Sequence, residues 1–204
     1  MNFELLDNLF QVSVLACAAI ASLLLAIRHV DRRLLILAFA YSCFSMGTLF
    51  FVLHIVITGD QPHIFYVSEL SWIASYLFFL SLQVVRMEGW RVRFSVLPAL
   101  CAGGTISTIV IPRMMGPSYL VSAMYAVSAA AIIYGSVFRL LRPGAHRALD
   151  GWFVVCVLLQ MALFLISPFM ADFTHLNLYF VVDFVLTGAY VFLLPLTLRE
   201  VKQP

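Results

Sequence analysis

Glu69 is the residue whose type and position point most directly to chemistry. It lies in the run from Tyr66 to Tyr76, Y-V-S-E-L-S-W-I-A-S-Y, inside a longer apolar segment. A charge in the middle of a membrane helix costs roughly 2.5–3.5 kcal/mol on insertion scales, so a carboxylate that persists there indicates a functional site. Trp72 follows Glu69 by one helical turn on the same face, where its ring could form the wall of a pocket and favour a cation above it.

Asp183 is a second acid of this kind, in the last apolar segment of the chain. Glu69 and Asp183 each lie about five residues inside one end of an expected helix, a depth of roughly 8 Å at 1.5 Å per residue. If the two carboxyls lie close together, one of them holds a proton at neutral pH. Such a pair could bind a cationic ligand, hold a metal or carry a proton. The alternative is that each acid only accepts hydrogen bonds from Ser68, Ser71 or Tyr190 and fixes helix packing.

Histidine and aspartate residues near the same end could extend this site toward a metal. Imidazole with carboxylate suits zinc or another transition metal. None of these residues has a tight ligand spacing such as H-x-x-x-H, and interfacial His and Asp also occur for solvation alone. The candidate ligand-binding residues are Ser68, Glu69, Trp72, Tyr76, Asp183, Tyr190 and His54, and the weaker metal candidates are His63, His175 and Asp172.

The composition defines the kind of element that must position these residues. The chain has 204 residues, 63% hydrophobic and 11% charged, with a mean hydropathy of +1.02. These values are typical of a polytopic membrane protein and not of a soluble domain. A net charge of +2 is too small to indicate a nucleic-acid partner. The N-terminus lacks the positive region of a cleavable signal peptide, so we expect the first helix to be retained.

Apolar windows of about 20 residues predict seven transmembrane helices. They cover 6–27, 34–57, 64–85, 94–111, 119–138, 151–170 and 177–198, with short connections between them. All Lys and Arg residues except Arg113 lie at alternate connections or after the last segment. The positive-inside rule therefore places the N-terminus outside and the C-terminus in the cytoplasm.

An internal repeat is the second organising feature. A shift of 114 residues aligns the first three segments with the last three without a gap, and it aligns Glu69 with Asp183 and Tyr76 with Tyr190. The fourth segment, rich in Gly, Ser and Thr, is then a linker. We expect one membrane domain over 1–204, with a first half at 1–86, a linker helix at 94–111 and a second half at 119–204, related by an axis along the membrane normal.

The run from Gly47 to Tyr76 resembles a pattern in the multi-helix membrane input regions of bacterial signalling proteins, which precede diguanylate cyclase or histidine kinase modules. In those regions G-x-x-P is followed by a serine–acid pair, an aromatic residue and a tyrosine. The matching positions here are Gly59, Pro62, Ser68, Glu69, Trp72 and Tyr76. The resemblance implies a multi-pass membrane sensor region in the cytoplasmic membrane of a bacterial cell. Because the chain ends six residues after the last expected segment, we expect no output module, and either a stand-alone sensor with a cytoplasmic or membrane signalling partner or an isolated input region.

A second resemblance is only architectural. Small sugar and vitamin transporters of the SWEET and PnuC type are similar in their 3+1+3 layout and length, but their proline-glutamine signature is absent here. A retinal protein also has seven helices in this orientation, and it requires a lysine in the last segment. Asp183 stands in that segment without a lysine, which excludes the retinal interpretation.

These observations favour a non-enzymatic sensor that binds a small ligand or ion, such as a small cation, from the outer side and needs no cofactor. The residues contain no nucleophile–base set. The alternative is a small transporter in which the same acids couple solute movement to protons or cations. A third hypothesis, an intramembrane metal-dependent hydrolase, requires a bound metal.

Overall fold

The chain folds entirely into helices in the part that the structure describes. The computed structural model describes residues 3–59, 66–88, 94–111, 119–142, 147–170 and 173–202. Its elements are α1 (Phe3–His29), α2 (Arg32–Thr58), α3 (Tyr66–Arg86), α4 (Val96–Val110), α5 (Tyr119–Leu140), α6 (Arg147–Ile166), the 3-10 helix η2 (Ser167–Phe169) and α7 (Leu178–Lys202). This confirms the predicted all-α fold, because each apolar segment coincides with one α-helix.

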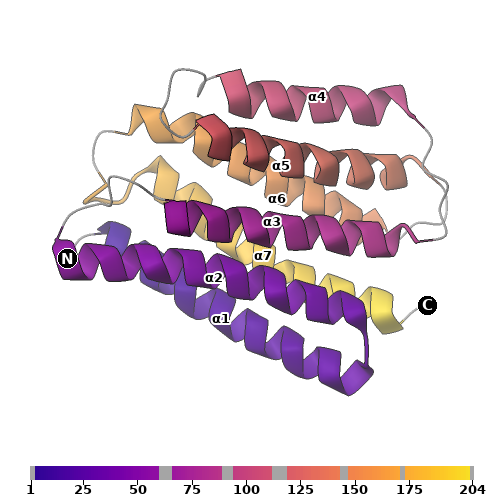
Figure 1. Ribbon diagram of the computed structural model, residues 1–204, viewed down its shortest axis with the longest axis horizontal. Helices are drawn as coiled ribbons and strands as arrows, with labels where there is room; N and C mark the ends of the chain where they lie inside the picture. The colour runs from indigo at the N-terminus through magenta and orange to yellow at the C-terminus, as the bar shows by residue number, and fades with distance from the viewer. Residues whose placement is uncertain are drawn as a thin grey trace.

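Six of the described helices close into a ring. α1 packs on α2, α2 on α3, α3 on α5, α5 on α6, α6 on α7, and α7 returns to α1. α4 lies outside this ring against α5 (Figure 1). Consecutive helices run in opposite directions, so the two termini lie at opposite ends of the bundle (Figure 1). We call the end where α3, α5 and α7 finish the basic end, because Arg86, Arg139 and Arg199 lie there.

Many polar residues face inward and many large apolar residues face outward, as α1 illustrates. Its buried face carries Asp7, Gln11 and Ser22, whereas Leu24 and Ile27 are 62% and 68% exposed. A water-soluble helix bundle has the opposite arrangement. The outward apolar surface is suited to lipid, and the chain is a multi-pass membrane protein.

The helices differ in their ability to span a bilayer. Six of the described helices are long and apolar enough to cross a membrane. α4 has 15 residues, a length of about 22 Å at 1.5 Å per residue, against a hydrocarbon core of about 30 Å. The sequence window of 94–111 predicts a longer helix there. The helix begins later because Ser95 has an extended backbone and acts as the N-cap.

The turn between α1 and α2 is held by its own side chains. The Asp31 carboxylate accepts a hydrogen bond from the Arg33 backbone N–H at 2.7 Å and from the Arg33 guanidinium at 2.8 Å. Burial opposes ionisation of Asp31, but these hydrogen bonds outweigh it and lower the pKa of the carboxyl. At the other end of α2, Gly59 takes a left-handed conformation with φ of 79° and donates to the Ile55 carbonyl.

An aromatic core fixes the centre of the ring. The Phe79 and Tyr190 rings stack with centroids 5.5 Å apart, and the Phe44 ring lies 5.2 Å from Tyr190. The Tyr41 hydroxyl donates to the Tyr190 carbonyl at 2.6 Å. These contacts join α2, α3 and α7, so the polar side chains above and below this layer are held in fixed relative positions.

Candidate functional site

Five polar side chains form a buried cluster between α1, α2 and α7. The cluster is toward the end of the bundle opposite the basic end, and we call it the acid cluster. Each of its residues is at most 8% exposed. Its members are Asp7, Gln11, Thr48, Asp183 and Thr187.

Gln11 is the hub of the acid cluster. Its amide nitrogen donates to the Asp183 carboxylate and to the Thr187 hydroxyl, both at 3.2 Å. Its amide oxygen accepts from the Thr48 hydroxyl at 2.9 Å. One amide therefore joins three helices, and replacing it with an apolar residue would leave several buried polar groups without partners.

The two acids of the cluster also meet. The Asp7 and Asp183 carboxyl groups lie close enough to interact with each other. A hydrogen bond between two carboxyl groups requires that one of them carries a proton. Gln11, which donates to Asp183, supplies no positive charge. Two carboxyl groups placed so close together can share a proton, or bind a small cation in its place.

Helical spacing explains why these residues share one site. On α1, Asp7 and Gln11 are four residues apart, and on α7 so are Asp183 and Thr187, so each pair lies on one helix face. Since α1 packs on α7, the two faces meet. Asp183 is predicted as a site residue from the sequence whereas Asp7 and Gln11 are not, although a polar pair at this spacing inside an apolar segment is a readable signal.

Trp72, predicted as a pocket wall, contacts the acid cluster through one hydrogen bond. Its indole N–H donates to the Thr48 hydroxyl at 3.2 Å, and its ring lies 6.3 Å from the Phe44 ring. The close approach of α2 to α3 makes this contact possible. A Cβ atom on Gly47 would lie 2.9 Å from the Ser68 carbonyl and 3.0 Å from the Trp72 ring.

Glu69 lies outside the acid cluster. Its side chain is half-buried in the first turn of α3, and Ser68 beside it is fully buried. The repeat predicts equal depth for Glu69 and Asp183 and leaves open whether they meet. In the structure Asp183 accepts a hydrogen bond from Gln11 of α1. α7 packs on α1, α2 and α6, whereas α3 packs on α2 and α5, so Asp183 and Glu69 belong to helices with different neighbours.

The histidine residues that the sequence predicts as ligands do not form a metal site in the part of the chain that the structure describes. His54 is half-buried near the end of α2, six residues beyond Thr48. His175 is exposed, and its Nδ1 lies 2.8 Å from the Thr174 hydroxyl. His63 and Asp172 lie outside the described residues. Within the described ranges, no group of three or more His, Cys, Asp or Glu side chains is placed to hold a metal ion.

Tyr76 and Tyr190, both predicted site residues, meet deeper in the bundle. Their hydroxyl groups are hydrogen-bonded to each other, and both lie within hydrogen-bonding distance of the Gln160 amide oxygen, at 3.4 and 3.3 Å. Tyr190 is seven residues after Asp183, about 10 Å along α7. These three residues, Tyr76, Gln160 and Tyr190, form a second buried polar layer, which we call the tyrosine layer.

A third buried polar layer lies at the basic end and consists of four charged side chains. We call it the ion-pair network, and its side chains are between 0% and 8% exposed. Its two cations come from α3 and α5, and its two anions come from α6 and α7. The members are Arg86, Arg139, Asp150 and Glu200.

Every cation in this network contacts both anions. Arg86 lies 2.7 Å from Asp150 and 2.9 Å from Glu200. Arg139 lies 2.9 Å from Asp150 and 3.5 Å from Glu200, and it also donates to the Arg86 carbonyl at 2.6 Å. Two positive and two negative charges balance, so their desolvation is compensated by hydrogen bonds from four helices.

The ion-pair network corrects one part of the sequence interpretation. The apolar windows predict Arg86 and Arg139 in connections, as charges that only set the orientation. The structure places both in the last turns of helices and buries them. One signal could have revealed this, because the 114-residue shift that aligns Glu69 with Asp183 also places Arg86 opposite Glu200, a residue of opposite charge.

Comparison with known proteins adds no functional information to these three polar layers. No protein-family model, curated protein or solved structure matches the chain.

Proposed function

We propose that the chain is a sensor domain of a bacterial cytoplasmic membrane that binds a proton or a small cation at the acid cluster. The observation that carries this proposal is the burial of two neighbouring carboxyl groups, Asp7 and Asp183, with Gln11 joining three helices around them. A carboxyl pair buried among polar side chains is costly for packing alone. Binding a cation there would replace the shared proton and alter how α1 and α7 pack.

The signal would travel along α7 to the basic end. α7 presents buried polar residues to the interior at Asp183, Thr187, Tyr190, Thr197 and Glu200. These positions run from the acid cluster through the tyrosine layer to the ion-pair network. A small displacement of α7 at the acid cluster would therefore change hydrogen bonds in both lower layers. The ion-pair network, which joins α3, α5, α6 and α7, is the element that a signalling partner would read.

The 3+1+3 repeat is part of the proposal. Helix neighbours support it, because α3 packs on α5 just as α7 packs on α1. Two direct contacts also support it. Tyr76 with Tyr190, and Arg86 with Glu200, are each 114 residues apart. Residues related by a pseudo-two-fold axis can touch only if they lie near that axis, so these pairs mark where the axis would run.

The orientation follows from the basic residues. We place the basic end in the cytoplasm and the acid cluster toward the outside, with α4 as a seventh, short crossing. The direction of the chain supports this crossing, since α3 finishes at the basic end and α5 starts at the opposite end (Figure 1). The segment containing α4 must carry the chain between them. A ligand would then enter from outside, and the partner would bind inside.

The resemblance between Gly47–Tyr76 and bacterial input regions gives the sensor proposal its biological setting. In this chain the resemblance covers the contact between α2 and α3, where Trp72 donates to Thr48 of the acid cluster. The resembling motif therefore adjoins the proposed binding site. This is the reason for preferring a sensor to an enzyme.

One observation favours a transporter as the second candidate. The buried polar residues continue along α7 from the acid cluster to Glu200, as a proton or cation pathway would require. In a transporter of the SWEET or PnuC type, protonation of Asp7 and Asp183 would be coupled to solute movement. The two candidates use the same acids, so mutation alone does not separate them.

Thermal stability of the purified full chain tests the binding proposal. We would compare sodium, potassium and choline salts over a pH series, using the wild type, Asp7→Asn and Asp183→Asn. Glu69→Gln is the matched control, because it removes an acid of the same depth outside the cluster. A ligand at a hundredfold excess over Kd raises stability by about 2.7 kcal/mol. We expect ligand-dependent stabilisation in the wild type and Glu69→Gln, and none in the two Asp variants.

Two outcomes would decide against binding at the acid cluster, and a third would decide against a sensor. If no cation and no pH change stabilises the wild type relative to the Asp variants, the acid cluster is a packing element. If Glu69→Gln alone abolishes the response, the site lies on α3. Cation or proton flux into sealed vesicles that is lost in Asp183→Asn would establish the transporter instead of the sensor.

A further inference from the structure

A proline interrupts the backbone hydrogen bonding of α7 between the tyrosine layer and the ion-pair network. Pro195 lies inside the helix, before Glu200. Proline has no backbone N–H, so the Val191 carbonyl loses the donor that position 195 would otherwise supply, and the proline ring crowds that carbonyl. Helices bend at such positions. The terminal segment of α7, 196–202, is therefore joined to the rest of the helix less firmly than a continuous helix would be.

Side chains of two other helices hold α7 on the near side of Pro195. The Trp152 indole N–H of α6 donates to the Ala189 carbonyl at 2.7 Å. The Tyr41 hydroxyl of α2 donates to the Tyr190 carbonyl at 2.6 Å. Both accepting carbonyls lie within two turns before Pro195. The body of α7 is thus tied to α2 and α6 up to the point where its own hydrogen bonding is interrupted.

Thr197, on the far side of Pro195, is buried with an unsatisfied hydroxyl. Its exposed fraction is 0%, and the hydroxyl has no hydrogen-bond partner among the residues that the structure describes. Thr105 and Thr108 of α4 behave differently, since each donates to the backbone carbonyl four residues earlier, at 3.0 and 2.8 Å. A buried hydroxyl without a partner is costly. A second arrangement of 196–202 could remove that cost.

Glu200 is the anion of the ion-pair network that has another cation nearby. It lies 2.9 Å from Arg86 and 3.5 Å from Arg139, whereas both arginines lie within 2.9 Å of Asp150. Arg33, at the start of α2, lies close enough for its charge to interact with that of Glu200, and α2 packs on α7. A small movement of the terminal segment therefore has a positive charge to meet.

Arg33 is suited to receive a second carboxylate. Its bonds to Asp31 come from Nε at 3.1 Å and from one terminal nitrogen at 2.8 Å. A guanidinium has five N–H donors in a fixed plane, so one such group can bind two carboxylates at different edges.

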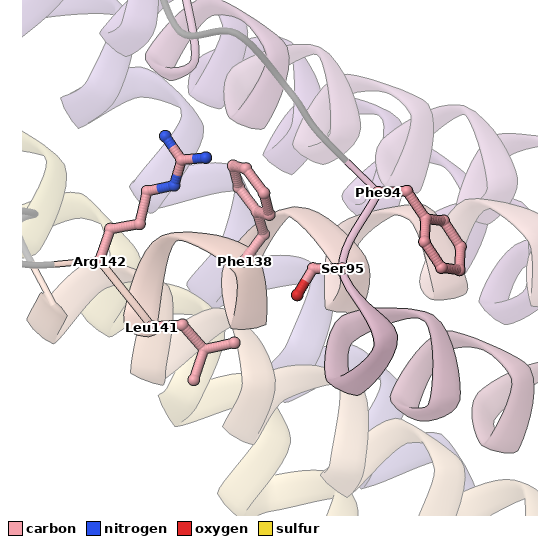
Figure 2. A pocket seen from close by; sticks show the side chains of 5 residues that line it. All are labelled: Phe94, Ser95, Phe138, Leu141 and Arg142. Carbon is pink, nitrogen blue, oxygen red and sulfur yellow. The ribbon is translucent and has the colours of Figure 1, made fainter.

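The cations of the network are held in place. Arg139 donates to the Arg86 carbonyl at 2.6 Å, which ties the end of α5 to the end of α3. One turn away, the Arg142 guanidinium carbon lies 4.3 Å from the centroid of the Phe138 ring, and Figure 2 shows these two side chains beside each other in a groove between α4 and α5. Of the four helices that meet in the network, only α7 contains a proline.

We propose that the terminal segment of α7, 196–202, swings about Pro195 and exchanges Glu200 between two sets of cations. In the arrangement that the structure shows, Glu200 binds Arg86 and Arg139. In the second arrangement Glu200 binds Arg33, and Asp150 alone remains with the two arginines. This inference rests on the contacts of α7 and not on the acid cluster, so it can fail while the proposed function stands.

Fluorine NMR of the full chain in detergent micelles tests the proposal. The background has the four native cysteines replaced by alanine, and a trifluoromethyl probe is attached to a single new cysteine. Arg199→Cys places the probe after Pro195. Val185→Cys places it before Pro195 on the same helix and is the matched control. Both positions are exposed.

Two states are expected only after the proline. The probe at Arg199→Cys should give two resonances in slow exchange, or one population-weighted resonance in fast exchange, and the probe at Val185→Cys should give a single resonance that the variants do not shift. Pro195→Ala restores the backbone N–H, so we expect it to leave one state at Arg199→Cys.

The populations should respond to the charges that the proposal names. Arg33→Gln removes the alternative cation and should lower the population of the second state about tenfold, as expected for one charge-assisted hydrogen bond. Thr197→Val removes the unsatisfied hydroxyl at nearly constant shape and should also favour the arrangement shown. Arg32→Gln is the charge control, because Arg32 pairs with the exposed Glu88, and it should leave the populations unchanged.

Three results would overturn the inference. The first is a single resonance at Arg199→Cys whose chemical shift is the same in Pro195→Ala and in Arg33→Gln. The second is a second state that persists unchanged in Arg33→Gln and Thr197→Val, which would mean ordinary fraying of the helix end. The third is an equal response to Arg32→Gln and Arg33→Gln, which would mean a diffuse charge effect. A thermal melt of each variant establishes that it is folded.

Discussion

At the residue scale, Arg86 and Glu200 form the most informative pair. Each belongs to a buried ion-pair network in which every cation contacts both anions. Removing one partner of a buried pair leaves a desolvated charge, which typically costs about 3–5 kcal/mol. We expect Arg86→Gln and Glu200→Gln each to lower the free energy of unfolding by this amount, measured by chemical denaturation in detergent micelles.

Exchanging the two charges distinguishes the contribution of the ion pair to stability from the contribution of each residue alone. The double variant Arg86→Glu/Glu200→Arg keeps two cations and two anions in the network, so it should be more stable than either single exchange. Arg32→Gln is the control, because its partner Glu88 and Arg32 itself are more than 60% exposed, and surface pairs contribute about 0–1 kcal/mol. If Arg86→Gln were as mild as Arg32→Gln, the network would be open to water in the membrane.

The residue scale is also where prediction from the sequence was weakest. Trp72 and Asp183 were identified because an aromatic ring or an acid inside an apolar segment stands out in any window. Asp7 lies near the N-terminus, where an acid is expected to face solvent, and its partner Asp183 is distant in the sequence. Whether a charge near a helix end reaches water or a buried partner depends on how the helices rotate about their axes, which apolar windows do not contain.

At the element scale, the contact between α2 and α3 positions Trp72 against the acid cluster. Gly47 permits this contact, because an added Cβ atom would lie 2.9 Å from the Ser68 backbone carbonyl. We expect Gly47→Ala to separate the two helices, to break the hydrogen bond from Trp72 to Thr48 and to destabilise the fold by about 1–3 kcal/mol. Tryptophan fluorescence would report the change around Trp72, and unfolding would report the stability.

Gly103→Ala is the control for this prediction. Gly103 lies in α4, and a Cβ atom added there would meet nothing within 4 Å, so the substitution introduces no clash. Alanine is a better helix former than glycine by up to about 1 kcal/mol, and we expect neutral or slightly increased stability. Should Gly47→Ala also be neutral, α2 and α3 can move apart without cost, and Trp72 is not held against the acid cluster by this contact.

The elements themselves were predicted well from the sequence, for a physical reason. A backbone inside a bilayer must satisfy its hydrogen bonds internally, so a long apolar segment has to be helical. The segment predicted at 34–57 corresponds to α2, Arg32–Thr58. The helix is longer than the apolar window because it begins directly after the Asp31 N-cap and ends directly before Gly59. α4 is the exception in length, since its composition is apolar but its helix has 15 residues.

At the scale of the whole molecule, the number of crossings determines which layer faces which compartment. With seven crossings, the acid cluster and the ion-pair network face opposite compartments and the termini lie on opposite sides. With α4 remaining on one side, α5, α6 and α7 could not keep the antiparallel order that Figure 1 shows relative to α3. For this reason we include α4 as a seventh crossing in the proposal, although it is short.

Labelling with a membrane-impermeant maleimide in intact cells tests this arrangement on the full chain. In a background with Cys17, Cys43, Cys101 and Cys156 replaced by alanine, we would place single cysteines at Thr58, Ile111, Val30 and Lys202, all of which are exposed. We expect Thr58→Cys and Ile111→Cys to react from outside, because both lie at the end opposite the basic end. Val30→Cys and Lys202→Cys should react only after lysis.

Labelling of Ile111→Cys decides whether α4 crosses the membrane, because Ile111 follows α4 directly. If Ile111→Cys reacts together with Val30→Cys after lysis, α4 does not cross and the parallel repeat loses its linker. If all four positions react in the reverse order, the acid cluster faces the cytoplasm, and a ligand from outside could not reach it without passing the ion-pair network. The expected order instead leaves the acid cluster toward the outer side and gives a cytoplasmic partner direct access to the end of α7.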